Sequence, residues 1–271
     1  MDAHETQLRK KSDQNSNATL RSLKFRSIAH FIALQNFHTL SLDIFDTLLL
    51  RGLKPEHARF WCVSRKIDEF LEKSGYKRSI SDIFLSRLLS AEVEYRSAPL
   101  VRGEREGRFI NIIALQLKSL KLPNQMLEDF IRIEIEHEIR SLSLNKPLLE
   151  LCRMTKNRGK RLILISDMYL DEKSIAKILD AHGIQDLFDF LYVSSDYGVT
   201  KAGSRLFEHV SNIEGLEPEG YLHLGDNYYS DVLSARSKGW GALWVPRGIS
   251  WRLLNSISKK LYRFHPDLAI Y

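Results

Sequence analysis

The chain has 271 residues, which is enough for one large domain or for a core with an accessory unit. No uninterrupted apolar segment reaches the ~18–20 residues that cross a bilayer, which argues against a membrane-spanning protein. The net charge of +6 lies at the two ends, since residues 1–37 carry +3 and residues 247–271 carry +4. No basic–aromatic platform accompanies it, so we expect no nucleic-acid partner.

The compartment is indicated by the start of the chain and by its cysteines. Residues 1–6 are polar and mixed in charge, unlike a secretory signal. Cys62 and Cys152 lack the spacing of a metal site and are expected to stay reduced. We therefore expect a cytoplasmic protein, whose basic ends could bring it to the inner face of the membrane.

The first informative segment follows a basic N-terminal extension or helix at residues 1–36. An apolar run at residues 40–42 leads into the sequence Asp-Ile-Phe-Asp-Thr at positions 43–47. Where a strand ends, Asp43 and Asp46 can converge, and two acids repel each other unless a cation or a shared proton lies between them. This pair suits metal-assisted phosphoryl transfer, with one carboxylate as nucleophile and the other as proton shuttle. The alternative is that Asp46 caps a turn and Asp43 is a surface acid.

Residues 53–144 have a helical pattern. Apolar residues recur at three- and four-residue spacing, and glycine and proline separate the stretches. The predicted helices are His57–Leu71, Ser81–Arg96, Phe109–Leu120 and Asn124–Ser141. We expect an all-helical insert with about four helices. Arginines of the insert could clamp an anionic substrate, although the interleaved glutamates favour an exposed, ion-paired face.

Strands and helices alternate from residue 145 to residue 248. The predicted helices are Pro147–Lys156, Glu172–Gly183, Ala202–Ile213 and Ser230–Lys238, and the strands are Arg161–Ser166, Phe190–Ser195, Leu222–Leu224 and Trp240–Val245. This alternation predicts an α/β fold, a doubly wound parallel sheet built from residues 37–52 and 145–248. The all-helical insert at residues 53–144 interrupts it after the first core strand.

Polar residues lie at or soon after the ends of these strands: Ser166, Asp167, Lys201, Asp226, Asn227 and Asp231. In a parallel sheet such ends meet in one crevice, where folds of this class bind ligands. Structural roles stay open for several of them. Ser166, Asp167 and Asn227 are also typical cap or turn residues. Lys201 is also typical of an exposed helix start, and Asp231 of a first helical turn.

Together these segments resemble the four motifs of the haloacid dehalogenase superfamily. Positions 43–47 resemble the first, Ser166 the second, Lys201 the third and positions 225–231 the fourth, over a range from about residue 37 to residue 245. The resemblance implies a Rossmannoid core, with the insert as a cap that closes over the site and selects the substrate. The sequences Ser-Asp-Met-Tyr at 166–169 and Gly-Asp-Asn-Tyr-Tyr-Ser-Asp at 225–231 are similar to a bacterial subgroup associated with glycosyltransferases and surface-polysaccharide biosynthesis.

The resemblance also implies a role for each residue. Asp43 would attack phosphorus and form an aspartyl-phosphate, while Asp46 would give and take the proton. The metal ligands would be Asp43, the backbone carbonyl of Asp46, Asp226 and Asp231, and the hard oxygen donors suit Mg²⁺. The substrate-binding residues would be Thr47, Ser166, Asp167, Lys201 and Asn227.

The expected activity is that of a Mg²⁺-dependent phosphatase acting on a small phosphorylated substrate, a sugar or polyol phosphate. Asp46 supports this expectation, because the dehalogenase branch of the superfamily lacks that acid. The alternatives are a phosphomutase, or a non-catalytic interaction module of a glycan-synthesis complex.

Residues 249–271 are predicted to form a basic C-terminal helix and tail. The stretch 249–263 has helical periodicity with a basic face. Such a helix could meet a glycosyltransferase or rest on an anionic membrane surface. We expect instead that it packs its apolar face on the core and exposes its lysines.

Overall fold

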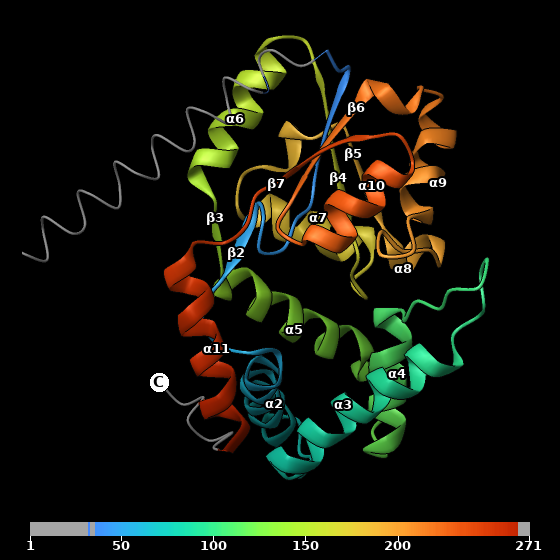
Figure 1. Cartoon of the computed structure of the whole chain (residues 1–271). Coiled ribbons are helices and arrows are strands. Elements are labelled where there is room, and N and C mark those ends of the chain that lie inside the picture. Colours follow the sequence, from blue (N-terminus) through green and yellow to red (C-terminus); the bar gives the residue numbers. More distant parts are fainter. Residues whose placement is uncertain (1–31, 33–35, 265–271) are drawn as a thin grey trace, which may run out of the picture.

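The computed structural model describes residue 32 and residues 36–264. The predicted N-terminal extension therefore lies almost entirely outside the described residues, as does the tail after residue 264. The described chain contains a five-stranded parallel sheet in the order β5-β4-β1-β6-β7 (Figure 1). Its strands are β1 (Thr39–Leu42), β4 (Arg161–Ser166), β5 (Phe190–Val193), β6 (Tyr221–Gly225) and β7 (Gly241–Trp244). This sheet confirms the predicted α/β fold.

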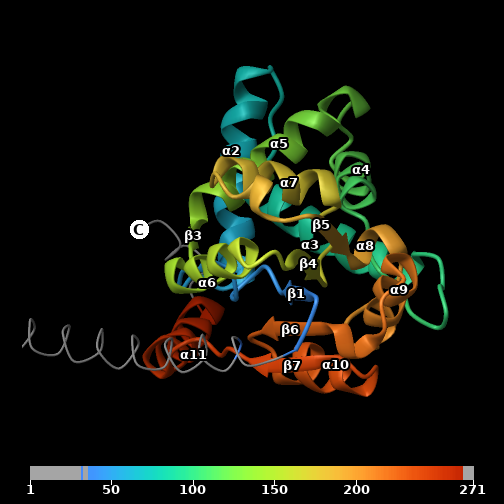
Figure 2. The ribbon, with the colours of Figure 1, turned by 90° about the horizontal axis from the view of Figure 1, so that it is seen from above.

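Strand β4 shows why both faces of the sheet are covered. Leu162 and Leu164 join one hydrophobic cluster, while Ile163 and Ile165 join another, because successive side chains of a strand point to opposite faces. Helices α6 and α7 pack into the first cluster and α9 into the second, so the sheet lies between them (Figure 2). The bounds of these helices are α6 (Lys146–Asn157), α7 (Glu172–Ala181) and α9 (Arg205–Glu214).

The insert is helical, as predicted, and lies beyond one end of the sheet (Figure 1). Its elements are α2 (Glu56–Lys73), α3 (Ile80–Ser97), α4 (Phe109–Ser119), the 3-10 turn η1 (Asn124–Met126) and α5 (Leu127–Ser141). Two antiparallel strands, β2 (Leu49–Arg51) and β3 (Leu142–Leu144), carry the chain into and out of it. The sequence did not predict this pair, because three-residue strands are too short to show a period.

Two predicted core helices differ from those observed. Helix α9 begins at Arg205 instead of Ala202, because residues 201–204 form a turn and Ser204 has a positive φ of 64°. The predicted helix at 230–238 is a π-helical segment, η4 (Tyr228–Leu233), that continues into α10 (Ser234–Ser237). The remaining short elements are η2 (Gln185–Leu187), α8 (Ser194–Tyr197) and η3 (Pro218–Gly220).

The C-terminal helix α11 (Ile249–Phe264) corrects another prediction. Its apolar side chains were expected to pack on the core, yet Leu253 and Ile257 are 62% and 55% exposed. The packed side carries Trp251 and Ser258 instead, and the Ser258 hydroxyl donates to the carbonyl of Leu53 at 2.7 Å. The expected burial of the apolar face was therefore wrong, whereas the exposed lysines were predicted correctly.

Candidate active site

The site is built around Asp43, which directly follows β1 and is 7% exposed. Its backbone N–H donates to the carbonyl of Leu224 in the neighbouring strand at 2.9 Å. Thr47 Oγ1 donates to Asp43 Oδ2 at 2.9 Å and accepts from the N–H of Asp226 at 3.0 Å. One threonine thus links the first and last of the predicted motifs across the ends of β1 and β6.

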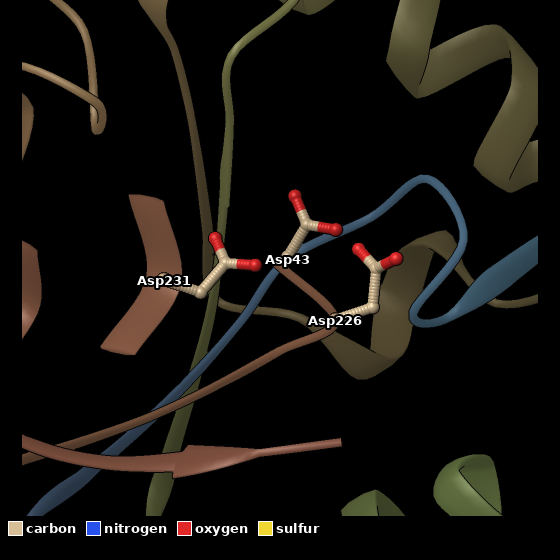
Figure 3. Close-up of side chains that lie close together, drawn as sticks. All are labelled: Asp43, Asp226 and Asp231. Atoms are coloured by element: carbon tan, nitrogen blue, oxygen red, sulfur yellow. The ribbon is translucent and has the colours of Figure 1, made fainter. Parts of the chain in front are cut away.

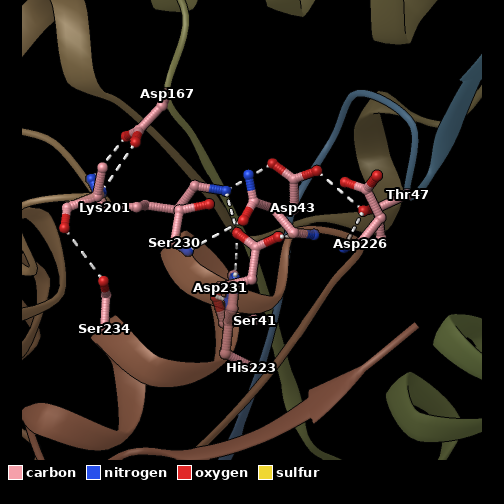
Figure 4. A network of polar contacts seen from close by, with 12 residues as sticks. Ser41, Asp43, Thr47, Asp167, Lys201, His223, Asp226, Ser230, Asp231 and Ser234 are labelled. Atoms are coloured by element: carbon pink, nitrogen blue, oxygen red, sulfur yellow. Dashed lines mark hydrogen bonds and ion pairs between the residues drawn. The ribbon is translucent and has the colours of Figure 1, made fainter. Parts of the chain in front are cut away.

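Lys201 lies between two carboxylates. Its Nζ is 2.6 Å from Asp43 Oδ1 and 2.7 Å from Asp231 Oδ1, and the residue is 2% exposed (Figure 4). Burial disfavours the ammonium form, but the attraction of Asp43 and Asp231 outweighs it and raises the pKa of Lys201. Lys201 is therefore a buried cation, and the alternative of a solvated lysine does not hold.

Asp231 is fixed from several directions. Besides Lys201, its Oδ2 accepts from the N–H of Asn227 at 2.9 Å. Gly225 makes the close approach possible, because a Cβ at that position would lie 2.1 Å from the Asp231 carboxyl carbon. His223 is fully buried, and its Nδ1 is 2.8 Å from the hydroxyl of Ser41. Burial alone would raise the pKa of the Asp231 carboxyl, but Lys201 and His223, whose Nε2 lies 3.5 Å from Asp231 Oδ1, hold it below its usual range.

Asp43, Asp226 and Asp231 form an acidic cluster that could hold a metal ion (Figure 3). One oxygen from each carboxylate lies within 4.8 Å of the others. Burial, opposed by Lys201 and reinforced by Asp231, raises the pKa of Asp43 to about 6. Burial, with the charges of Asp43, Asp46 and Asp231, raises that of Asp226 to about 7. One lysine does not neutralise three close acids, so the oxygen donors and the excess charge both fit a hard divalent cation such as Mg²⁺.

Asp46, the second acid of the first motif, points elsewhere. Its Oδ1 accepts from Arg247 Nη1 at 2.5 Å and from the N–H of Arg51 at 3.3 Å, and its φ is 65°. The acidic cluster does not include its carboxylate. Arg247 was not among the predicted site residues. Its position after the last core strand and Pro246 could have indicated it, since that position lies at the same edge of the sheet as the acids.

The other predicted site residues lie nearby. Ser166 ends β4 and is buried. Asp167 accepts from the N–H groups of Lys201 at 2.7 Å and Ala202 at 3.1 Å, so it holds the lysine turn. Asn227 Oδ1 accepts from the N–H groups at the start of η4, at 3.0 and 3.3 Å. These contacts are the cap and turn roles that the sequence left open for Asp167 and Asn227.

The insert reaches the site through the loop between α3 and α4. Glu104 accepts from the N–H of Thr200 at 2.6 Å and from Arg205 Nη1 at 2.7 Å. Glu106 accepts from the hydroxyl of Ser194 at 2.8 Å. The glutamates interleaved with the arginines of the insert were predicted to form an exposed, ion-paired face; Glu104 is ion-paired with Arg205, but Glu104 and Glu106 are both partly buried.

Three arginines of the insert form ion pairs within the protein. Arg87 is buried and makes a bidentate pair with Glu134 at 2.9 and 2.8 Å. Arg96 pairs with Glu92 on the exposed surface, and Arg102 pairs with Glu208 of α9. For these three, the contacts favour ion pairing over the predicted substrate clamp.

Comparisons with known proteins agree with this geometry. The haloacid dehalogenase-like hydrolase family matches residues 37–239. Haloacid dehalogenase-like hydrolase domain-containing protein 3 of Homo sapiens is 29% identical over 119 residues, which are 43% of this chain and 45% of that protein. Phosphoserine phosphatase of Thermus thermophilus is 33% identical over 94 residues, 35% of this chain and 37% of that protein. The chain thus spans less than half the length of these curated relatives.

The fold also resembles solved structures. The 2-haloacid dehalogenase of Pseudomonas syringae pv. Tomato DC3000 is similar with a TM-score of 0.55 at 14% identity, covering 84% of this chain and 99% of that one. This likeness concerns the fold alone.

Proposed function

The chain belongs to the haloacid dehalogenase-like hydrolase family, and we propose that it hydrolyses the phosphomonoester of a small metabolite with Asp43 as the nucleophile. The observation that carries the proposal is the 2.6 Å contact between Lys201 Nζ and Asp43 Oδ1 beside two further acids. A buried carboxylate held by an ammonium group at the end of a parallel strand suits nucleophilic attack on an anionic group. Asp46, the second acid of the first motif, makes phosphorus the expected electrophile, because the dehalogenase branch of the superfamily lacks that acid.

In the proposed reaction, an oxygen of Asp43 bonds to phosphorus while the bond from phosphorus to the leaving oxygen breaks. A water molecule then attacks the phosphorus and releases Asp43. Thr47 and Lys201 hydrogen-bond the two oxygens of the nucleophile, which fixes its direction of attack. Lys201, with Ser166, would also offset the charge on the phosphoryl oxygens. Asp43, Asp226, Asp231 and the carbonyl of Asp46 would hold Mg²⁺, which would supply electrostatic stabilisation of the phosphoryl group.

Asp46 would protonate the leaving oxygen and later accept a proton from water. In the described state its Oδ1 accepts hydrogen bonds from Arg247 Nη1 and from the N–H of Arg51, so the carboxyl group is held by these partners. The proposal therefore requires that Asp46 exchange Arg247 for the substrate during the reaction.

We propose a sugar or polyol phosphate as the substrate. Burial raises the pKa of Tyr95, and the charges of Glu106, Glu56 and Asp167 raise it further. Tyr95 lies within the field of these carboxylates, and Glu106 brings this part of the insert to the core, where it accepts from the hydroxyl of Ser194 at 2.8 Å. Carboxylate and phenol oxygens can bind the hydroxyl groups of a sugar, whereas they would repel a leaving group with further negative charge. A role in surface-polysaccharide biosynthesis, suggested by the sequences at 166–169 and 225–231, would fit such a substrate.

A phosphatase screen tests the proposal. The intact chain is incubated with sugar, polyol and nucleotide phosphates, with and without Mg²⁺, beside Asp43→Asn. We expect free phosphate from sugar or polyol phosphates only with Mg²⁺, and no turnover by the variant. Isomerised sugar phosphate would instead identify a phosphomutase. If no phosphate is released from any substrate, and Asp43→Asn changes only partner binding, the chain is an interaction module.

A further inference from the structure

Helix α11 presents an apolar face to solvent. Five large apolar side chains, at three- and four-residue spacing, are half or more exposed. They are Ile249, Leu253, Leu254, Ile257 and Leu261. Single exposed apolar side chains are common on protein surfaces, but several that gather on one side of a helix indicate an interaction surface.

The opposite side of α11 attaches the helix to the rest of the molecule. Trp251 lies 3.8 Å from the guanidinium of Arg247, measured to the ring centre. Ser258 Oγ donates to the carbonyl of Leu53 at 2.7 Å, and the carbonyl of Tyr262 lies 3.1 Å from His57 Nε2. Figure 1 shows α11 at the edge of the molecule beside α2. The side of α11 that carries Trp251 and Ser258 therefore faces the molecule, which leaves the apolar face exposed.

Basic residues accompany the apolar face. Arg252, Lys259 and Lys260 are exposed, and residues 249–264 contain no Asp or Glu. Lys260 lies seven residues after Leu253, so it borders the apolar side of the helix, while Arg252 and Lys259 share the adjoining side. None of the described helices combines the length and the hydropathy that a membrane-spanning segment needs. An apolar stripe bordered by cations without acids is the pattern of a helix that lies in the surface of an anionic bilayer.

We propose that α11 binds the surface of an anionic membrane through this apolar face and its bordering basic residues. The charge decides between possible occupants, because a second copy of the chain would bring the same cations against this face. An anionic lipid surface supplies the opposite charge and accepts the apolar side chains. The chain would then act on its substrate beside a membrane.

Sedimentation with vesicles tests this inference on the full chain. One vesicle preparation contains phosphatidylcholine alone and the other equal parts of phosphatidylcholine and phosphatidylglycerol. We expect binding to the anionic vesicles and at least tenfold weaker binding to the neutral ones. Ile257→Glu should weaken binding at least tenfold, while Ile213→Glu is the matched control, since Ile213 on α9 is 52% exposed and Ile257 is 55% exposed.

A second pair of variants separates charge from apolar contact. Lys259→Glu with Lys260→Glu should weaken binding about 25-fold or more, because each basic residue near an anionic surface contributes about fivefold. Lys173→Glu with Lys177→Glu on α7 makes the same change of charge at exposed positions and should weaken it much less. Thermal midpoints confirm that each variant is folded.

Three results would overturn the inference. One is equal binding, or none, to the two kinds of vesicle. Another is an equal effect of the α11 variants and their controls. The third is a dimer that Ile257→Glu dissociates while vesicles are not bound, which would assign the face to a second copy.

Discussion

Arg247 Nη1 donates to Asp46 Oδ1 across 2.5 Å, and Arg247 Nη2 donates to the carbonyl of Arg51 at 3.1 Å. One guanidinium thus joins the end of the last core strand to the first motif and to β2. Because β2 leads into the helical insert, the contact connects the proposed acid–base residue with the entry to the insert. Burial lowers the pKa of Arg247, but Asp46 opposes this, and an arginine stays charged under all ordinary conditions.

The first prediction concerns stability. Arg247→Ala removes hydrogen bonds between charged and partly buried groups, so it should lower the free energy of unfolding by about 1.5–3 kcal/mol. Arg252→Ala is the matched control, since Arg252 is exposed on α11 and should cost at most about 0.5 kcal/mol. Urea unfolding of both variants measures the difference. Equal losses would show that the contact with Asp46 contributes nothing measurable.

The second prediction concerns proton transfer. If Asp46 protonates the leaving oxygen, Asp46→Asn should slow single-turnover phosphorylation by an alkyl phosphate about 10²–10⁴-fold. Phosphorylation by p-nitrophenyl phosphate should slow much less, because nitrophenolate leaves without a proton. Asp180→Asn, at an exposed position on α7, should change neither rate. An equal loss with both substrates would remove Asp46 from the proton-transfer step.

The third prediction concerns the metal. With Mg²⁺ at 100 times its Kd, the cation should stabilise the protein by about 2.7 kcal/mol. Asp226→Asn removes one acid of the cluster and should abolish most of this gain, whereas Asp180→Asn should retain it. Thermal unfolding with and without Mg²⁺ measures both. A gain that survives Asp226→Asn would place the ion elsewhere.

Prediction from the sequence succeeded where side-chain pattern and chain order decide the structure. The acids and the lysine lie together because buried parallel strands end at one edge, and each strand could be recognised from its apolar run. The contacts of Asp46 and Glu104 could not be predicted, since they depend on how the last strand and the insert meet the core. The orientation of α11 was wrong for a similar reason: its periodicity shows an apolar side but not what lies against it.

The fourth prediction concerns pH. Burial raises the pKa of Glu106 from 4.5 to about 7, and Asp167 and Glu104 add to this against the hydrogen bond from Ser194. Between pH 4.5 and pH 7 the folded state therefore binds more protons than the unfolded state, so this group's contribution to stability is lost as the pH rises. The resulting decrease in the free energy of unfolding is at most about 3 kcal/mol.

Glu106→Gln should remove this loss. The quantity to compare is the free energy of unfolding of the variant minus that of the wild type. This difference should be larger at pH 7.5 than at pH 5 by about 1–3 kcal/mol. Glu92→Gln, at an exposed glutamate, should give the same difference at both values of pH. An equal pH dependence in wild type and Glu106→Gln would show that Glu106 is hydrated in the folded protein.

The fifth prediction concerns the contact between the insert and the lysine turn. Glu104 accepts from the N–H of Thr200 at 2.6 Å, from its hydroxyl at 3.1 Å and from Arg205 at 2.7 Å. Lys201 follows Thr200, and its own N–H donates to Asp167 at 2.7 Å. The turn that presents the lysine is thus held from the core on one side and from the insert on the other.

Glu104→Ala should loosen this turn. Losing hydrogen bonds to a carboxylate lowers the free energy of local opening by about 1.5 kcal/mol, so the amides of residues 200–202 should exchange with solvent about tenfold faster. Glu104→Gln keeps the shape and an acceptor but not the charge, so its effect should be smaller. Glu92→Ala breaks an exposed pair with Arg96 and should leave these amides unchanged. Exchange that is unchanged in Glu104→Ala would mean that Asp167 holds the lysine turn without help from Glu104, and that the insert does not fix this part of the site.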